Sequence, residues 1–225
     1  MAGLGQKKNV LLADLDGTLV DSAPDLAAAA NKLLVELGSE ALPLERIRGM
    51  IGDGMPALVE RALTAREIAF GPEFLPGAVA RMKAFYAQDI AVETRPYPGV
   101  RRALEALRAA GWRLAVCTNK PEKLSHALLQ ALQLDGLFAA VAGGDSYAER
   151  KPAAGHPLRL LEALGAPPEQ AVLLGDGPND ILAARAAGID EIWFSGGYGG
   201  AAAEALAPRR RIDGFAELAP LLERL

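Results

Sequence analysis

The sequence predicts an α/β protein with a doubly wound parallel sheet, into which an all-helical cap is inserted. Three observations support this fold class. Short apolar runs alternate with helical patterns over most of the chain, the order that generates parallel sheets. The runs are apolar throughout, as in strands buried on both faces. One stretch, residues 22–95, has successive helical patterns without a strand between them.

Five apolar runs are predicted to be the strands of the sheet: residues 10–13, 114–117, 140–142, 171–174 and 192–194. Helical spacing of apolar residues predicts the helices between the later runs at 100–110, 121–132, 157–164 and 180–187. Gly111, Gly165 and Gly188 follow three of these patterns, where a helix is expected to end.

The stretch without strands is predicted to form a separate cap of four helices, at residues 23–37, 44–51, 56–69 and 74–91. Its hinges are expected just after Val20 and at the Pro-Tyr-Pro-Gly segment 96–99, where two prolines oppose a helix. The predicted division is therefore a core domain of residues 1–21 and 96–225 and a cap domain of residues 22–95.

Composition argues against several classes of function. The net charge of −4 offers no basic surface for nucleic acid or anionic lipid. Arginines 209–211 are the one tight basic run and are expected in a solvated loop. Residues 1–8 are polar and precede only a few apolar residues, too few for a signal peptide or membrane span. With a single cysteine, these features predict a cytoplasmic protein.

Cys117 and the two histidines are assigned no chemistry. Cys117 lies in an apolar run with no evident base beside it and is expected to be a packed thiol. His126 falls on a helical pattern and His156 in a loop before a proline, and neither has a partner histidine at metal-ligand spacing. Both are expected to serve structure or face solvent.

Polar clusters follow the predicted strands, and the first is D-L-D-G-T-L at residues 14–19. Asp14 and Asp16 can share a pocket at the strand's end, and a divalent cation would relieve their repulsion. Gly17 lets the chain turn and present backbone N–H groups to an anion, and Thr18 adds a hydroxyl donor.

Three further clusters follow later runs. Thr118 and Asn119 precede a proline at a helix start, where hydroxyl, amide and N–H groups suit phosphate oxygens, although the same turn could simply cap the helix. Lys151 precedes a proline and is held extended, so its ammonium group can reach across the sheet. Asp176 and Asp180 bracket a turn, with Asp180 in the first helical turn.

The order of these clusters closely resembles the haloacid dehalogenase-like superfamily, over essentially the whole chain. Its four motifs are matched by Asp14 and Asp16, by Thr118, by Lys151, and by Asp176 and Asp180. The cap segment beginning M-I-G-D-G at residue 50 and the segments T-R-P-Y-P-G-V and L-A-V-C-T-N-K-P look like bacterial phosphoglycolate phosphatases. Two departures are K-P-A-A-G-H-P from residue 151, where K-P-x-P is usual, and Gly177, where serine or threonine is commoner.

The resemblance implies a phosphatase that uses an aspartyl-phosphate. Asp14 would be the nucleophile, and Asp16 the general acid and later the base. Mg²⁺ would be held by Asp14, the Asp16 backbone carbonyl and Asp176, with Asp180 orienting the ligands. Phosphate would be bound by Gly17, Thr18, Thr118, Asn119 and Lys151, and the cap tip Gly52, Asp53 and Gly54 would reach the substrate.

The expected substrate is 2-phosphoglycolate, hydrolysed to glycolate and phosphate. Alternatives within the superfamily are a sugar-phosphate phosphatase, a pyrophosphatase or a phosphomutase, and a non-catalytic phosphate-binding module is an alternative of a different class. Magnesium, manganese and cobalt all accept the same oxygen ligands. The expected partner is a small phosphate ester, not nucleic acid or a membrane, and the chain could be a monomer or a homodimer.

Overall fold

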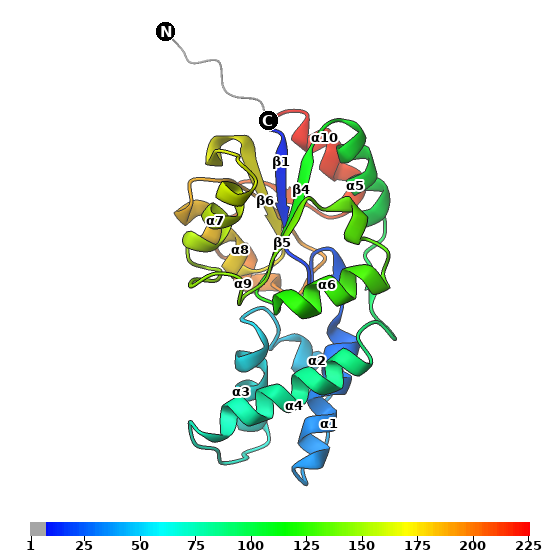
Figure 1. The fold of residues 1–225 in the computed structure, drawn as a ribbon, viewed down its shortest axis with the longest axis vertical. Helices are drawn as coiled ribbons and strands as arrows, with labels where there is room; N and C mark the ends of the chain where they lie inside the picture. Colours follow the sequence, from blue (N-terminus) through cyan, green and yellow to red (C-terminus); the bar gives the residue numbers. More distant parts are fainter. Residues whose placement is uncertain (1–7) are drawn as a thin grey trace.

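The computed structural model describes residues 8–225. The expectation that the N-terminus carries no signal peptide concerns mainly residues 1–7, which lie outside the described residues. In Figure 1 a sheet flanked by helices occupies the upper half of the molecule, and helices α1–α4 lie below it.

The central sheet has six strands, all parallel, in the order β5-β4-β1-β6-β7-β8. The strands are β1 (Val10–Ala13), β4 (Arg113–Cys117), β5 (Ala140–Ala142), β6 (Ala171–Gly175), β7 (Asp190–Phe194) and β8 (Arg211–Ile212). In register, Ala13 at the end of β1 pairs with Val116 of β4 and with Leu174 of β6. The predicted α/β fold class is confirmed, and the central strand β1 ends one residue before each of its two neighbours.

Helices cover both faces of the sheet. α5 (Val100–Ala109), α6 (Glu122–Ala131) and α10 (Leu218–Leu222) pack on the face that contains Leu11 of β1. α7 (Gly155–Ala163) and α8 (Pro178–Ala186) pack on the face that contains Leu12. Alternate β1 side chains therefore enter two different cores, which explains why the strands are apolar throughout. Gly111, Gly165 and Gly188 follow α5, α7 and α8 with φ of 86°, 61° and 68°, as expected for helix ends.

The shorter elements complete the core. They are α9 (Gly200–Glu204) and the 3₁₀ turns η1 (Asp135–Leu137), η2 (Pro168–Gln170) and η3 (Phe215–Glu217). None of these was predicted, and neither were α10 and β8. All are five residues or fewer, which is too short for a hydrophobic period to be recognised.

Residues 23–88 form four helices: α1 (Ala23–Glu36), α2 (Leu44–Arg48), α3 (Met55–Ala65) and α4 (Phe74–Gln88). They share an apolar cluster of their own that includes Leu34, Ile47, Leu63 and Met82. We call α1–α4 the helical cap. Leu124 of α6 belongs to the same cluster, so the cap also packs on the core. The proposed domain limits at residues 22 and 95 remain a prediction.

Two chain crossings join the cap to the core. β2 (Val20–Asp21) and β3 (Arg95–Pro96) pair antiparallel at the positions expected to be hinges. The buried carboxylate of Asp25 in α1 accepts hydrogen bonds from the backbone N–H groups of Glu93 and Thr94 and from the Thr94 hydroxyl. These hydrogen bonds join the segment that enters the cap to the segment that leaves it. The backbone N–H groups of Glu93 and Thr94 both have an acceptor.

The prediction of a solvated loop at arginines 209–211 is confirmed only in part: Arg209 and Arg210 lie outside any helix or strand, and the Arg209 side chain is 66% exposed. Arg211 lies in β8 at the sheet edge, and the Arg210 guanidinium donates to Asp190 at 2.9 Å. The Arg209 N–H donates to the buried Glu191. Arg209 and Arg210 thus contact acidic residues of β7, which are close only after the sheet has formed.

The expectations for His156 and Cys117 also need correction. His156 lies in α7 and is fully buried, and its Nδ1 is 3.9 Å from the Cys117 Sγ. A base therefore does lie beside the cysteine. Burial lowers the pKa of His156 to about 4 and raises that of Cys117 to about 12, so both groups are neutral at pH 7. Cys117 is a buried thiol, as predicted.

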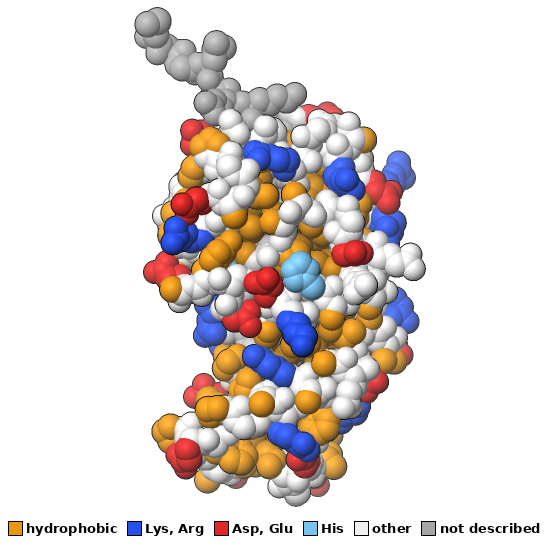
Figure 2. Space-filling model, viewed as in Figure 1, with side chains coloured by type: hydrophobic (Ala, Val, Ile, Leu, Met, Phe, Trp, Pro, Cys, Tyr) orange, Lys and Arg blue, Asp and Glu red, His pale blue; other side chains and the backbone are white. Residues whose placement is uncertain are grey.

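The surface seen in Figure 2 mixes the two signs of charge. Lys and Arg side chains alternate with Asp and Glu over the core and over the cap on that face. Among residues 8–225, no helix is long and apolar enough to cross a membrane.

Candidate active site

The candidate site lies at the carboxyl ends of β1, β4 and β6, facing the helical cap. Asp14 follows β1, Thr118 follows β4 and Asp176 follows β6. Since these strands are neighbours in register, the side chains that follow them converge, which is where open α/β sheets bind ligands.

Three carboxylates gather there around one ammonium group. Asp14, Asp176 and Asp180 each bring a carboxylate oxygen within 4.8 Å of the others. The Lys151 Nζ lies 2.9 Å from the Asp14 Oδ1 and 2.5 Å from the Asp180 Oδ1. Asp180 occupies the first turn of α8, and its Oδ2 accepts the Gly177 N–H at 3.0 Å. The predicted acids and the predicted lysine are thus brought together.

This cluster carries more negative than positive charge. Burial, opposed by Lys151, raises the pKa of Asp14 to about 6. Burial together with the charges of Asp180 and Asp14 raises the pKa of Asp176 to about 8. Lys151 alone does not balance three buried carboxylates. Closely spaced carboxylate oxygens are the ligands that hard divalent cations such as Mg²⁺ prefer, so the donor set fits the predicted metal.

The loop after β7 holds Asp176 in place. Its Oδ2 accepts the backbone N–H groups of Tyr198 at 2.7 Å and Gly199 at 3.2 Å. The indole N–H of Trp193 donates to the Asp176 carbonyl at 2.9 Å. Tyr198 and Gly199 belong to the glycine-rich segment 196–200. In the structure this segment contacts a predicted metal ligand directly.

Gly17 and Thr18 lie behind the acidic cluster. The buried Thr18 hydroxyl donates to the Asp176 Oδ1 at 2.8 Å. The Gly17 N–H donates to the Val20 carbonyl at 2.9 Å, and φ of 86° allows the close turn. A Cβ on Gly17 would lie 2.6 Å from the Asp176 Oδ2. Both donors are engaged within the protein, which differs from the phosphate contact expected of them.

Thr118 and Asn119 form the opposite wall. The Thr118 hydroxyl accepts the Lys120 N–H at 3.2 Å. Both Thr118 and Asn119 line the cleft between the sheet edge and the cap. The Asn119 side-chain amide donates to the carbonyls of Gly52 and Lys151, each at 3.0 Å. Asn119 therefore joins the cap tip to the segment that carries the site lysine.

Asp16 is held by residues that sequence reasoning did not single out. Lys120 Nζ lies 2.9 Å from its Oδ1 and 3.1 Å from its Oδ2. The Ser22 hydroxyl donates to the same Oδ1 at 2.5 Å. Tyr86 of α4 contacts the Lys120 ammonium with its hydroxyl at 2.9 Å. The only available signal for Lys120 was its place in the T-N-K-P turn.

The cap tip reaches the core at two points. The Asn179 side-chain amide donates to the Gly52 carbonyl at 3.3 Å and to the Asp53 Oδ1 at 2.7 Å. Arg61 pairs with the other oxygen of Asp53. Although partial burial opposes it, hydrogen bonds from Asn179 and Arg61 lower the pKa of Asp53. Asp53 is thus an anion that fixes the tip to α8.

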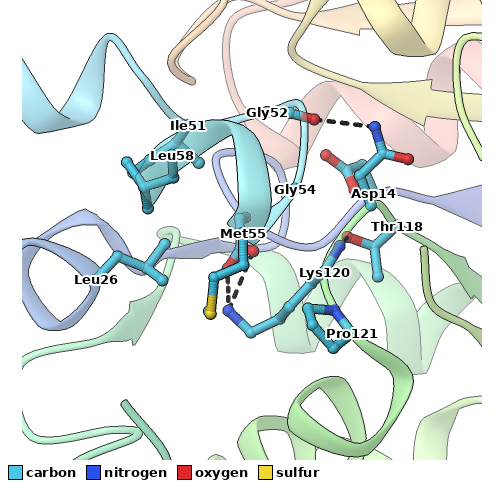
Figure 3. A pocket seen from close by; sticks show the side chains of 12 residues that line it. Asp14, Leu26, Ile51, Gly52, Gly54, Met55, Leu58, Thr118, Lys120 and Pro121 are labelled. Carbon is cyan, nitrogen blue, oxygen red and sulfur yellow. Dashed lines mark hydrogen bonds and ion pairs between the residues drawn. The ribbon is translucent and has the colours of Figure 1, made fainter. Parts of the chain in front are cut away.

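An apolar wall from the cap faces the polar residues. In Figure 3, Leu26, Met55 and Leu58 lie across the cleft from Asp14 and Thr118. The cleft contains ten of the predicted site residues: Asp14, Asp16, Gly52, Asp53, Gly54, Thr118, Asn119, Lys151, Asp176 and Asp180. A ligand bound between the two walls would be polar at the sheet and contact hydrocarbon at the cap.

A cleft of this kind, at the carboxyl edge of a doubly wound sheet and under a helical cap, defines a class of hydrolase. Residues 11–194 match the family described as haloacid dehalogenase-like hydrolase, and the chain belongs to that family.

Individual relatives share most of its length. It is 40% identical to a phosphoglycolate phosphatase of Colwellia psychrerythraea, over 97% of this chain and 99% of that protein. It is 44% identical to a phosphoglycolate phosphatase of Nitrosospira multiformis, over 84% and 83% of the two chains. The crystal structure of a predicted phosphoglycolate phosphatase from Haemophilus somnus superposes with a TM-score of 0.89 at 33% identity, over 97% and 99% of the chains.

Proposed function

We propose that this protein hydrolyses 2-phosphoglycolate to glycolate and phosphate, in a magnesium-dependent reaction through an aspartyl-phosphate on Asp14. Its broader class, a phosphoric monoester hydrolase, follows from the family and from relatives named phosphoglycolate phosphatase. The observation that carries the proposal is the cluster of Asp14, Asp176 and Asp180 around Lys151 at the sheet edge.

The carboxylates of Asp14, Asp176 and Asp180 and the backbone carbonyl of Asp16 would hold the metal. Bound there, Mg²⁺ would neutralise the acidic cluster and polarise the phosphoryl oxygens. Thr18, Tyr198 and Gly199 support this role, since their hydrogen bonds leave Asp176 in one orientation. Such second partners of a ligand commonly fix its position.

In the first step, a carboxylate oxygen of Asp14 attacks phosphorus. A bond forms between that oxygen and phosphorus, and the bond from phosphorus to the glycolate oxygen breaks. Asp16 gives its proton to the departing oxygen, so that glycolate leaves with a hydroxyl group. Asp14 and Asp16 both line the cleft, which supports their acting on one substrate.

In the second step, water attacks the phosphorus of the aspartyl-phosphate. Asp16 takes a proton from the water, the bond from phosphorus to the Asp14 oxygen breaks, and inorganic phosphate leaves. Asp14 returns to a carboxylate. Two groups on the same turn thus perform both halves of the reaction.

Lys151, Thr118 and Asn119 would bind the phosphoryl oxygens. The Lys151 ammonium is buried among the acids, where its charge is weakly screened. The loose transition state of phosphoryl transfer spreads negative charge over three oxygens, so a fixed cation there lowers the barrier. Thr118 and Asn119 present a hydroxyl and an amide from the neighbouring strand.

The leaving group would lie against the cap. Leu26, Met55 and Leu58 line this side of the cleft together with Lys120, and the relatives named phosphoglycolate phosphatase favour glycolate as the leaving group. A cytoplasmic location is also proposed, supported by the composition with a single, buried cysteine.

A phosphate-release screen tests the proposal. Purified protein is incubated with 2-phosphoglycolate, hexose phosphates, pyrophosphate and other small phosphates, with Mg²⁺ or with EDTA. We expect Mg²⁺-dependent release, with the highest kcat/KM for 2-phosphoglycolate. A hexose phosphate preferred by tenfold or more would reject the substrate, and no release from any ester would reject the phosphatase. A long-lived phosphoenzyme with little net release would indicate a mutase.

A further inference from the structure

We propose that Lys120 and Tyr86 are positioning residues through which the helical cap sets the location of the Asp16 carboxyl group. The inference rests on the proposed role of Asp16 as acid and base. It adds that Asp16 acts at its full rate only while the Tyr86 hydroxyl, on α4, contacts the Lys120 ammonium group.

Lys120 is buried in an unusual setting for a lysine. Its side chain is 1% exposed, although it lies at the start of the connection from β4 to α6, next to the cleft. A buried ammonium group is costly unless its donors are satisfied. Here they are directed to both carboxylate oxygens of Asp16 and to the Tyr86 hydroxyl. Figure 3 shows the Lys120 side chain extending from beside Pro121 toward Met55 of the cap.

Tyr86 brings the cap into this arrangement. It lies in α4 and is fully buried in the cap's apolar cluster. Its ring centroid is 4.3 Å from the Lys120 Nζ, so the ammonium meets both the ring face and the hydroxyl. The position of α4 on the core therefore determines whether Lys120 has its second partner.

The contact between Tyr86 and Lys120 affects the position of the Asp16 carboxyl group. Its two oxygens are contacted by Lys120 from the core and by Ser22 at the start of the cap. Proton transfer requires the carboxyl oxygen within hydrogen-bond reach of the leaving oxygen, and small displacements are costly. If Lys120 loses its Tyr86 contact, it can follow other rotamers, and Asp16 loses a fixed partner.

The test compares two substrates whose leaving groups need a proton to different degrees. An alkoxide such as that of glycolate must be protonated as it departs, whereas 4-nitrophenolate is a stable anion. kcat/KM is measured for 2-phosphoglycolate and for 4-nitrophenyl phosphate, because it reports only the steps through phosphoenzyme formation. The ratio of the two values reports acid catalysis and is insensitive to a general loss of active protein.

We expect Tyr86→Phe to lower kcat/KM for 2-phosphoglycolate about fivefold, the loss of one hydrogen bond. Lys120→Met should lower it on the order of a hundredfold, the scale of a misplaced acid. Both variants should lose much less on 4-nitrophenyl phosphate. Because Tyr86 acts through Lys120, the double variant should be no worse than Lys120→Met alone.

Matched controls separate this from a structural effect. Tyr147→Phe and Lys123→Met make the same changes away from the site, at a tyrosine packed on His156 and at an exposed lysine of α6. Both should leave the substrate ratio unchanged. Tyr86→Phe retains the ring and should fold even if Lys120→Met does not, as checked by circular dichroism.

Unchanged ratios in Tyr86→Phe and Lys120→Met, or additive losses in the double variant, would overturn the inference. Asp16→Asn is measured with the same two substrates. If Asp16→Asn collapses the ratio and the positioning variants do not, only the inference fails. If Asp16→Asn leaves the ratio unchanged, the proposed role of Asp16 fails first.

Discussion

At the scale of single residues, the carboxyl groups of Asp14, Asp176 and Asp180 form the acidic cluster that would bind the metal. The pKa of Asp14 is raised to about 6 and that of Asp176 to about 8, chiefly by burial. The ordinary pKa of an exposed aspartate is 3.8. Between about pH 4 and 8 these two carboxyl groups therefore hold more protons in the metal-free folded protein than in the unfolded chain, so their contribution to the free energy of unfolding falls as the pH rises.

Magnesium must compete with these protons, which gives a pH-dependent prediction. We expect MgCl₂ to raise the Tm little at about pH 5 and clearly more at about pH 8.5, because the ligands are carboxylates only at the higher pH. The Tm is measured with MgCl₂ and with EDTA at both values. Asp176→Asn should abolish most of the difference at high pH. An equal rise at both values would contradict the proposed ligands.

At this scale the sequence predicted the acids and Lys151 but missed their supporting residues. Asp14 and Asp176 follow strands directly, so local pattern and the rule for sheet edges locate them together. Lys120 contacts Asp16 across 104 positions of sequence, and the Tyr198 N–H contacts Asp176 across 22. No local pattern distinguishes such residues from a helix cap or a loop.

Among the elements, helix α1 has an unusual N-terminus. Ser22 is its N-cap, yet its hydroxyl donates to Asp16 and does not cap the helix. The Tyr198 hydroxyl instead accepts the N–H groups of Ser22 at 2.8 Å and Ala23 at 3.0 Å and donates to the Asp21 Oδ1 at 2.7 Å. Tyr198 therefore connects the first cap helix to the loop that holds Asp176.

Removing the Tyr198 hydroxyl should destabilise the contact between the start of α1 and the loop after β7. We expect Tyr198→Phe to lower the free energy of unfolding by roughly 0.5–2 kcal/mol, the usual cost of losing an N-cap acceptor. The backbone N–H that contacts Asp176 is retained, so the calorimetric affinity for Mg²⁺ should change less than twofold. Urea unfolding of Tyr198→Phe is compared with Tyr147→Phe. Equal stability of the two variants would show that the hydroxyl does not cap α1.

Element length explains which helices and strands the sequence predicted. β1, β4 and β6 are apolar for four or five residues and lie inside the sheet, so their pattern is local. β2, β3 and β8 have two residues each and exist through pairing with a distant partner. His156 lies in a helix and not in the predicted loop, because α7 begins at Gly155, two residues before Pro157.

For the whole molecule, the proposed function depends on how closely the cap approaches the core. Gly54 has φ of 84°, and a Cβ there would lie 3.0 Å from the Asn119 carbonyl. Residues other than glycine are strained at this φ, and the neighbour is backbone, which gives way poorly. The glycine thus permits the cap tip to contact the turn after β4.

We expect Gly54→Ala to lower kcat/KM for the proposed substrate about tenfold, since backbone strain and the close contact together cost on the order of 1–2 kcal/mol. Gly77→Ala is the matched control: it lies in α4 with nothing near a new Cβ, and alanine favours a helix there. Steady-state kinetics of the two variants checks this. Wild-type activity in Gly54→Ala would mean that the tip need not approach Asn119.

The molecule's plan was largely predictable, because alternating strands and helices and a stretch without strands are properties of the chain itself. Its assembly was not: the contact of Asn119 with Gly52 and of Asn179 with Asp53 joins parts that meet only in three dimensions. In the proposed mechanism, recognition of the leaving group depends on that assembly, whereas the phosphoryl chemistry depends on the residues at the strand ends.

The central claim, that Asp14 is the nucleophile of a magnesium-dependent phosphatase, is tested most directly by phosphate release from 2-phosphoglycolate. Wild type and Asp14→Asn are compared with Mg²⁺ and with EDTA, after circular dichroism has shown that the variant folds. The proposed mechanism predicts release only by wild type with Mg²⁺, because an amide is a poor nucleophile. More than about a tenth of wild-type activity in folded Asp14→Asn would contradict it, since loss of a nucleophile costs far more.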